Sequence, residues 1–413
     1  MLSSKTLKLF HESVEKIRNL RLHIEGENIL MIDAIKLKKI SLSRIIAKFR
    51  NPTKELRAST IADLKEANYE NIIFALTFPL ESYLDNILGK IIIRCIEEND
   101  SDIFERLISL ATSEFESIEF LEITPIWGIK TKEPIIINDR IRLVPINDLP
   151  DSKQKDELLN FQNNDFFFGN IILSRPETAI VAKQKITRQD IKEQYKNIDY
   201  FTDKISTALV AFFPCAIWEY SRWIQFDNPD FDTLSMKADK AKPIIDILPK
   251  FTFSKEITQN EYTLIIEFLN KYLNLDKKVR DKINIALVRL NNSLKRTNEG
   301  DRALELSIAF EVLLSEESTS EISYKVRVRG SRLIGGDINQ RLKNFDILSN
   351  IYSIRSQMVH KGSVKAGKQY NIFGLQKINA HEVCTESTVL CANLINIIID
   401  YRSFPKWREF DIN

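Results

Sequence analysis

The sequence predicts a mainly α protein with a small β-containing middle region, an α+β fold class. Three observations predict it. The 413 residues include only 11 glycines, which is few for a turn-rich β protein. Apolar residues recur at helical spacing through residues 1–120 and again from residue 258 onwards. Between these stretches, residues 121–186 contain short apolar runs interrupted by prolines, which is typical of small strands.

The length exceeds what one hydrophobic core usually serves, so we expect more than one domain. The predicted regions are a helical region at 1–120, a small β-rich segment followed by helix at 121–226, a linker at 227–257 and a helical bundle at 258–413.

Composition narrows the class of protein. Hydrophobic residues at 44%, charged residues at 28% and a net charge of +2 describe an ordinary globular chain, so any RNA contact must come from local clusters of Lys and Arg. The cysteines form no Cys-x2-Cys pair, and we predict buried thiols, no metal and no cofactor. An apparent lack of signal peptide and membrane span predicts a cytoplasmic protein without a membrane partner.

The N-terminal region is predicted to be helical throughout. The expected helices cover about 7–22, 32–49, 60–98 with a break near Pro79, and 101–120. His11 and His23 lie here without a second ligand at metal spacing, so we interpret them as surface or packed residues.

The middle region is predicted to start with strands at 121–146, including a turn at Asn138-Asp139, and to continue with strands at 166–186 and a helix at 187–221. Trp218, Tyr220 and Trp223 cluster near Arg222. They could stack bases, but packing of a helix end is the interpretation we favour.

The C-terminal region has the clearest helical periodicity. Two apolar stripes predict antiparallel helices joined by a turn at 298–300, namely Ile283, Leu287, Leu290 and Leu294, then Ala303, Leu306, Phe310 and Leu313. A helix carrying Arg355 and a final helix at about 381–401 complete a predicted four-helix arrangement.

The predicted chemical centre is residues 351–362. An apolar stripe precedes it at Ile338, Leu342, Phe345, Leu348 and Tyr352. Continued at helical spacing, the stripe reaches Arg355, so we expect this arginine on the buried face with a carboxylate partner. Glu305 and Glu311 are the candidates, and we favour Glu311. His360 follows in the last turn, which Gly362 ends.

Arg355 and His360 are residue types suited to RNA cleavage. Imidazole can take the 2′-hydroxyl proton and protonate a leaving 5′-oxygen, while a guanidinium stabilises charge on the phosphorane, without a metal. Ser356 and Gln357 are supporting candidates. Five residues along an ideal helix correspond to about 140° of rotation. We therefore expect that the helix end deforms or that a second subunit completes the site.

The Arg355 to His360 spacing resembles the Arg-x4-6-His motif of HEPN domains. The blocks ALVRLNNSLKRTNEGDRALELSIAFEVLL (286–314) and ISYKVRVRGSRLIGG (322–336) precede it, and the ordered series resembles the Apea-like branch over roughly 258–403. In this resemblance Glu311 falls in AFEVLL, which is similar to the family phrase Ala-Leu-Glu-Ala-Leu-Leu. The resemblance implies a helical bundle, usually dimeric and often a metal-independent RNase, with Arg355 and His360 catalytic.

The same resemblance leaves two functions open. One is an endoribonuclease, an antiphage or abortive-infection toxin that acts on tRNA or other cellular RNA after a phage or cellular trigger, as a homodimer through the C-terminal bundle. The alternative is a non-catalytic module for RNA binding or dimerisation in a defence or regulatory complex. Gly362 stands where toxins silenced by a nucleotidyltransferase partner often have a tyrosine, so we do not expect that control.

Basic residues near the motif are the candidate RNA contacts. They are Lys361 and Lys365, joined by Lys368, and the more distant Lys325, Arg327, Arg329 and Arg332. A solvated surface is the alternative for each. Residues 362–368 have the glycine and lysine spacing of a P-loop, but Gln369 replaces its Ser or Thr and no strand precedes it, so we reject nucleotide hydrolysis there.

Overall fold

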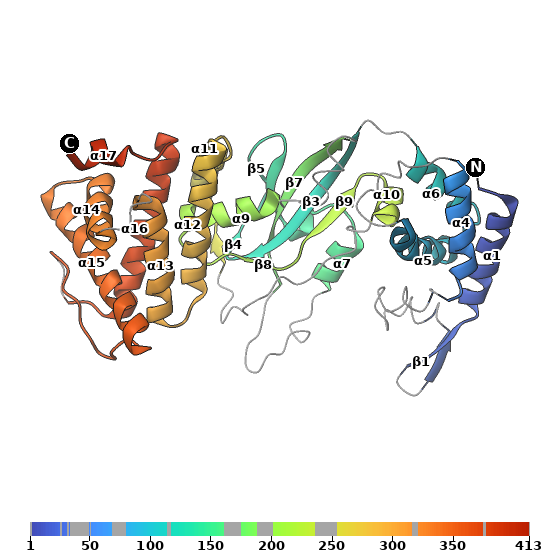
Figure 1. The fold of residues 1–413 in the computed structure, drawn as a ribbon, viewed down its shortest axis with the longest axis horizontal. Coiled ribbons are helices and arrows are strands. Elements are labelled where there is room, and N and C mark those ends of the chain that lie inside the picture. The colour runs from blue at the N-terminus through green and yellow to red at the C-terminus, as the bar shows by residue number, and fades with distance from the viewer. Residues whose placement is uncertain are drawn as a thin grey trace. The chain divides into compact units, whose positions relative to one another are not determined.

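The computed structural model describes residues 2–24, 27–30, 33, 49, 51–67, 80–113, 117–160, 175–187, 201–235, 254–315, 321–374 and 377–412. The protein is mainly α with a small β-containing middle region, as Figure 1 shows, so the predicted fold class is confirmed. The chain divides into two compact units. Unit 1 comprises Met1–Leu121, Lys183–Asp199 and Trp223–Lys240, and unit 2 comprises Glu122–Ala182, Tyr200–Arg222 and Ala241–Asn413.

Unit 1 is predominantly helical. Its described elements are α1 (Ser4–Arg18), β1 (Arg21–Ile24), β2 (Glu27–Leu30), α4 (Lys54–Glu66), α5 (Leu80–Glu98), α6 (Ile103–Thr112), β9 (Trp223–Phe226) and α10 (Pro229–Leu234). The Ser3 hydroxyl caps α1 by accepting from the Thr6 amide. Phe10 of α1 stacks on Phe104 of α6 in the core, with ring centroids 4.4 Å apart.

Two predictions for this region are corrected, and two others lie almost entirely outside the described residues. The helix expected at 7–22 ends at Arg18, and an antiparallel β1–β2 hairpin follows. The helix expected at 101–120 ends at Thr112, and strand β3 begins at Ser117. The helix expected at 32–49 and the break near Pro79 fall almost entirely among residues that are not described.

Unit 2 combines a sheet with the C-terminal helices. Its elements are β3 (Ser117–Trp127, from Glu122), β4 (Ile129–Lys130), β5 (Ile135–Ile136), β6 (Ile141–Pro145), η2 (Ile146–Asp148), α7 (Lys153–Leu159), β7 (Thr178–Thr187, to Ala182), α9 (Phe201–Phe212), β8 (Trp218–Glu219), β10 (Lys255–Glu256), α11 (Gln259–Leu273), α12 (Lys277–Lys295), α13 (Glu299–Leu314), α14 (Ile322–Ile334), α15 (Ile338–Lys361), α16 (Ala380–Tyr401) and α17 (Trp407–Ile412).

The sheet has the strand order β5-β6-β7-β3-β8, and the pairs β5–β6, β6–β7 and β3–β8 are antiparallel. The predicted turn at Asn138-Asp139 joins β5 to β6, because the Asn138 side-chain oxygen accepts from the amides of Arg140 and Ile141. The strands expected at 166–186 are described only from residue 175, where β7 follows.

The helix predicted at 187–221 is corrected. Its described part, α9, ends at Phe212, and Pro214 follows, which cannot donate a helical hydrogen bond. Trp218 then pairs with Trp127 of β3 instead of continuing a helix. Tyr220 stands edge-on to Trp127, with ring centroids 5.3 Å apart, so these aromatic residues take part in packing.

The β segment and the C-terminal helices share one hydrophobic core. Ile126 and Leu143 of the strands belong to the same buried cluster as Leu287, Phe310 and Leu394 of the bundle. In Figure 1 the helices α12 to α16 lie alongside one another. Part of the predicted linker is folded, because α10 and β10 fall within 227–257 and Leu234 and Ile257 are buried.

Helix α16 is long and apolar enough to cross a membrane by length and composition, among the residues that the structure describes. Of its most apolar window, 61% is buried inside the protein. A core helix of a bundle has the same property.

A buried carboxylate closes the start of α9. Glu122, which is 1% exposed, accepts from the amides of Phe201 and Thr202 and from the Thr202 hydroxyl, so a strand residue caps the helix. Arg222 lies 3.8 Å away and also pairs with Glu219 and Asp203. Burial raises the pKa of Glu122 in spite of the Thr202 hydrogen bonds.

This shift predicts a pH-dependent stability. A carboxyl group whose pKa is raised by folding stabilises the fold while protonated, and the contribution is lost as pH rises through the folded-state pKa. Gln cannot ionise. The melting temperature of Glu122→Gln minus that of the wild type should therefore increase as pH rises above the usual range of a glutamate pKa.

Glu119→Gln, on the same strand, is the control. Its hydrogen bond with Lys183 lowers the pKa of Glu119. The melting temperature of Glu119→Gln minus that of the wild type should therefore decrease with pH or stay constant. A Glu122→Gln difference that is constant with pH would contradict the prediction.

Candidate active site at the end of helix α15

Helix α15 positions Arg355 and His360. It is a single helix of 24 residues whose start is capped by Asp337, which accepts from the Gln340 amide. At its end Gly362 adopts the left-handed conformation, φ 68°, and its amide donates to Met358. The helix remains regular through Lys361, so a deformed helix end does not bring Arg355 and His360 together.

The buried face of α15 differs from the predicted stripe. It consists of Asn344, Ile347, Leu348, Ile351 and Ile354. Ile338 is 64% exposed and Leu342 is 39% exposed, although both belonged to the predicted stripe. Apolar residues occur on both faces of this helix, so spacing alone gave the wrong phase.

Arg355 is consequently at the edge of the buried face, beside Ile354, and not within it. Its side chain is 32% exposed. Its Nη1 donates to Glu311 Oε1 at 2.8 Å, so the predicted contact with Glu311 is confirmed. The other candidate, Glu305, pairs with Arg289 and Arg296 at 3.0 and 3.1 Å.

Tyr352, one turn before Arg355, is a participant that we did not predict. Its hydroxyl donates to the same Glu311 oxygen at 3.2 Å, and the Arg355 guanidinium carbon lies 5.6 Å from the centre of its ring. Burial, followed by the Glu311 charge, raises the pKa of the Tyr352 phenol, so it stays a neutral donor. The sequence feature that could have indicated this role is the hydroxyl group of Tyr352, a polar group on a residue of the predicted apolar stripe.

The Arg355 guanidinium keeps unused donors. Only Nη1 has a hydrogen bond among the described residues, which leaves Nη2 and Nε for another acceptor. A planar fork held on one side by a carboxylate can present two parallel donors to a phosphate.

His360 is exposed in the last turn of α15. Across the residues that the structure describes, no hydrogen bond or ion pair involves its ring, so it can exchange a proton with a substrate. Arg355 reaches back towards Tyr352, whereas His360 lies five residues further along the helix. Within one chain the two side chains are therefore not in contact.

The supporting candidates differ in their roles. Gln357 donates from Nε2 to the Ser353 carbonyl at 3.1 Å and to the Tyr370 hydroxyl at 3.2 Å, which anchors the loop after α15. Ser356 is exposed, and its hydroxyl makes no hydrogen bond to another described side chain.

The prediction of Arg329 as an RNA contact is wrong. Arg329 is 2% exposed, pairs through two nitrogens with Asp411 of α17 at 2.9 and 2.7 Å, and donates to the Leu314 carbonyl. Arg332 is partly engaged by the same helix, since it lies 4.9 Å from the Phe410 ring. The docking of α17 on α14 is a long-range contact that sequence spacing does not reveal.

The remaining basic candidates are more accessible. Lys361 and Lys365 are exposed and line a depression at the end of α15. Lys325 and Arg327 are half-buried, and Arg327 donates to the Ser323 carbonyl and lies over the Phe345 ring.

Metal ligands and reactive thiols do not contribute to the site. Among the described residues no group of three His, Cys, Asp or Glu side chains could hold a metal ion. The cysteines are free, and burial raises the pKa of Cys215 and of Cys384 to about 11. The predicted buried thiols are confirmed for Cys95, Cys384 and Cys391, and Cys215 is half-buried.

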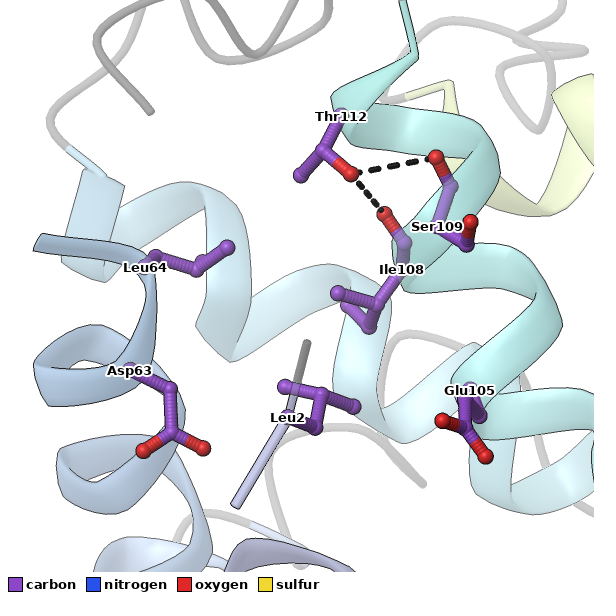
Figure 2. Close-up of a pocket in the computed structure, with 7 residues that line it drawn as sticks. All are labelled: Leu2, Asp63, Leu64, Glu105, Ile108, Ser109 and Thr112. Carbon is purple, nitrogen blue, oxygen red and sulfur yellow. Dashed lines mark hydrogen bonds between the residues drawn. The ribbon is translucent and has the colours of Figure 1, made fainter. Parts of the chain in front are cut away.

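Unit 1 has a small pocket of about 140 Å³, drawn in Figure 2. Its lining residues are Leu2, Asp63, Leu64, Glu105, Ile108, Ser109 and Thr112. The Asp63 carboxylate accepts from the Ser3 amide and hydroxyl, and no basic side chain lines the space. The pocket therefore presents two carboxyl groups, Asp63 and Glu105, and no cationic side chain that could bind a phosphate, unlike the end of α15.

Comparison of the chain with protein-family models, curated proteins and solved structures finds no match. Fold and site thus define a mainly α protein of two units, with an arginine, a carboxylate and an exposed histidine near one end of its C-terminal bundle.

Proposed function

We propose that this protein is a metal-independent endoribonuclease in which Arg355 and His360 act on the RNA phosphodiester. The observation that carries the proposal is the contrast between the two side chains. Arg355 is fixed by Glu311 but keeps unused donors, while His360 on the same helix is exposed and has no partner among the described residues. A fixed cation and a free proton-exchanging group are what phosphodiester transfer requires. The HEPN resemblance leads to the same assignment.

In the proposed reaction, neutral His360 takes the proton of the 2′-hydroxyl, whose oxygen attacks the adjacent phosphorus. The bond from phosphorus to the 5′-oxygen breaks, and an imidazolium protonates that oxygen. The products are a 2′,3′-cyclic phosphate and a 5′-hydroxyl. Arg355 donates to the phosphoryl oxygens as their negative charge increases.

Because one regular helix separates Arg355 from His360, the proposal includes a homodimer through the C-terminal bundle. A two-fold axis repeats each patch and can bring Arg355 of one copy to His360 of the other. We further propose a cytoplasmic antiphage or abortive-infection effector that cleaves tRNA or other cellular RNA after a phage or cellular trigger, without a cofactor or a membrane.

A second candidate function is a non-catalytic module for RNA binding or dimerisation in a defence or regulatory complex. The orientation of Arg355 favours it, since the guanidinium bonds to Glu311 and stacks near Tyr352 on the side away from His360. In this role the Arg355–Glu311 pair fixes the register of α15 on α13.

The chemistry of the cut ends tests the proposal. Purified protein with total RNA and EDTA should yield 2′,3′-cyclic phosphate ends, because the nucleophile is the substrate's own hydroxyl. A 2′-deoxy substitution at the cut nucleotide should abolish cleavage there. Cleavage of DNA, or a requirement for added magnesium, would rule out the mechanism. RNA binding without any cleavage would favour the second candidate.

A further inference from the structure

The loop after α15 forms an open depression of about 380 Å³. It is lined by Gln357, Lys361, Lys365, Ala366, Gly367 and Lys368. Three of these side chains carry an ammonium group and none is acidic. Its lining residues Gln357 and Lys361 stand on either side of His360 in the sequence, so the depression adjoins the proposed active site.

The lysines differ in how firmly they are held. Lys368 is half-buried, donates weakly to the Ser353 hydroxyl at 3.4 Å and lies 4.7 Å from the centre of the Tyr370 ring. Lys361 and Lys365 are exposed, and in the described part of the chain neither makes an ion pair or a side-chain hydrogen bond. Two ammonium groups are therefore available to a ligand next to one that is already positioned.

The polar lining is also preformed. The Gln357 amide nitrogen must face the Ser353 carbonyl, because a carbonyl oxygen only accepts, and the same nitrogen reaches the hydroxyl of buried Tyr370. The orientation of the amide is thus fixed, and its oxygen is left as an acceptor. Gly367, with φ 71°, has no atom within 4 Å of where a Cβ would be, so the loop is open at this point.

The electrostatic balance favours an anion. The carboxyl end of a helix is equivalent to about half a negative charge, which three ammonium groups outweigh. A buried cation lies at the same end of the bundle, because Gly300 at the start of α13 packs closely against Met358 of α15. This cation is Arg302, 8% exposed, whose side-chain partner among the described residues is His381. The first turn of α13 also contains Glu299 and Asp301, so the excess of positive charge is local to the three lysines of the depression.

We propose that this depression binds the phosphodiester backbone of the RNA strand next to the bond on which His360 acts. The inference rests on the proposed function for the identity of the strand, and on the lysines and the depression for the chemistry of recognition. Lys361 and Lys365 supply the ion pairs. Gln357 and Lys368 fix the wall against which the backbone lies.

The test measures binding separately from cleavage. In a His360→Ala background, Lys361→Ala/Lys365→Ala is compared with Lys277→Ala/Lys278→Ala, two exposed lysines at the start of α12. The start of α12 is at the opposite end of the bundle from the start of α13, since Lys282 reaches the Ser315 carbonyl just after α13 ends. Both variants lose the same charge.

The probe is a mixed-sequence single-stranded RNA, titrated at several salt concentrations. The logarithm of the RNA-binding constant falls as the logarithm of the salt concentration rises. Each lost phosphate contact should make this slope less steep by about 0.7, hence by about 1.4 for the Lys361 and Lys365 variant. The Lys277 and Lys278 variant should keep the original slope. Lys361→Arg/Lys365→Arg should restore it, because it restores both charges.

Two results would overturn the inference, and a third would separate it from the proposed nuclease activity. Equal slopes for the two double-alanine variants would overturn it. Displacement of RNA by inorganic pyrophosphate without any slope change in the Lys361 and Lys365 variant would assign the depression to a free phosphate compound, and would overturn it too. A reduced slope in a protein whose wild type never cuts RNA would uphold backbone binding in the depression and refute the proposed nuclease.

Discussion

His360→Ala should lower the rate of RNA cleavage by about 10²–10⁴-fold, the usual contribution of a positioned general acid or base. The substitution should leave the fold intact. His360 is exposed and has no hydrogen bond or ion pair among the described residues, and surface substitutions of this kind usually change stability by less than about 0.5 kcal/mol. The measurement pairs single-turnover cleavage with the thermal unfolding midpoint.

His11→Ala is the matched control, since His11 is an exposed histidine of α1 in unit 1. It should cleave at the wild-type rate. Equal activity of His360→Ala and wild type would remove His360 from the mechanism. Loss of activity together with a large drop in melting temperature would instead assign His360 a structural role.

Arg355→Lys separates charge from geometry at the other residue. Lysine retains the charge opposite Glu311 but offers a single ammonium in place of the planar fork, so stability should be kept while cleavage falls. Arg355→Ala removes the partner of the partly buried Glu311 carboxylate, so we expect it to lower both the melting temperature and the rate of cleavage.

Mixing an Arg355→Ala chain with a His360→Ala chain should restore cleavage to about half the wild-type value per dimer, if each site takes Arg355 from one copy and His360 from the other. One of the two sites in such a mixed dimer is complete, and the other lacks both residues. The two chains carry different affinity tags, so that only mixed dimers are purified.

The reciprocal mixture tests the same geometry from the other side. A dimer of one wild-type chain and one Arg355→Ala/His360→Ala chain should be inactive, because neither shared site is complete. Activity of this second mixture, with none from the first, would place both residues in one chain. A wild-type protein that is fully active as a monomer would also refute the shared site.

Much of the fold is local and could be predicted. The helices α12 and α16 follow from apolar spacing, because one face of each is buried and the other is solvated. Helix α13 also follows from its apolar stripe, although its remaining residues are buried or half-buried too. The predicted inward residues Leu287, Leu290, Leu306 and Phe310 are all buried. The turn at Asn138 follows from its own side chain, which bonds to the next amides whatever surrounds it.

The phase of α15 could not be predicted in this way. Ile338, Leu342 and Val359 are exposed, so the apolar pattern fits two faces, and the choice between them depends on which neighbouring helices cover the surface. Helix α14 is one of these neighbours, since Leu348 of α15 packs against Gly330 of α14.

The sequence by itself determined the mainly α class, the helical nature of 338–361 and the residue types at its end, because these depend on spacing and chemistry within a few turns. It also led to Glu305 and Glu311 as candidate partners of Arg355, since a buried guanidinium requires a carboxylate, and the resemblance of AFEVLL to a family phrase favoured Glu311, which is the observed partner. Only the tertiary structure decided that Tyr352 joins this pair, that Asp411 pairs with Arg329 beneath α17, and that Lys361 and Lys365 remain accessible. These outcomes depend on which distant segments pack together, and residue spacing along the chain carries no information about that.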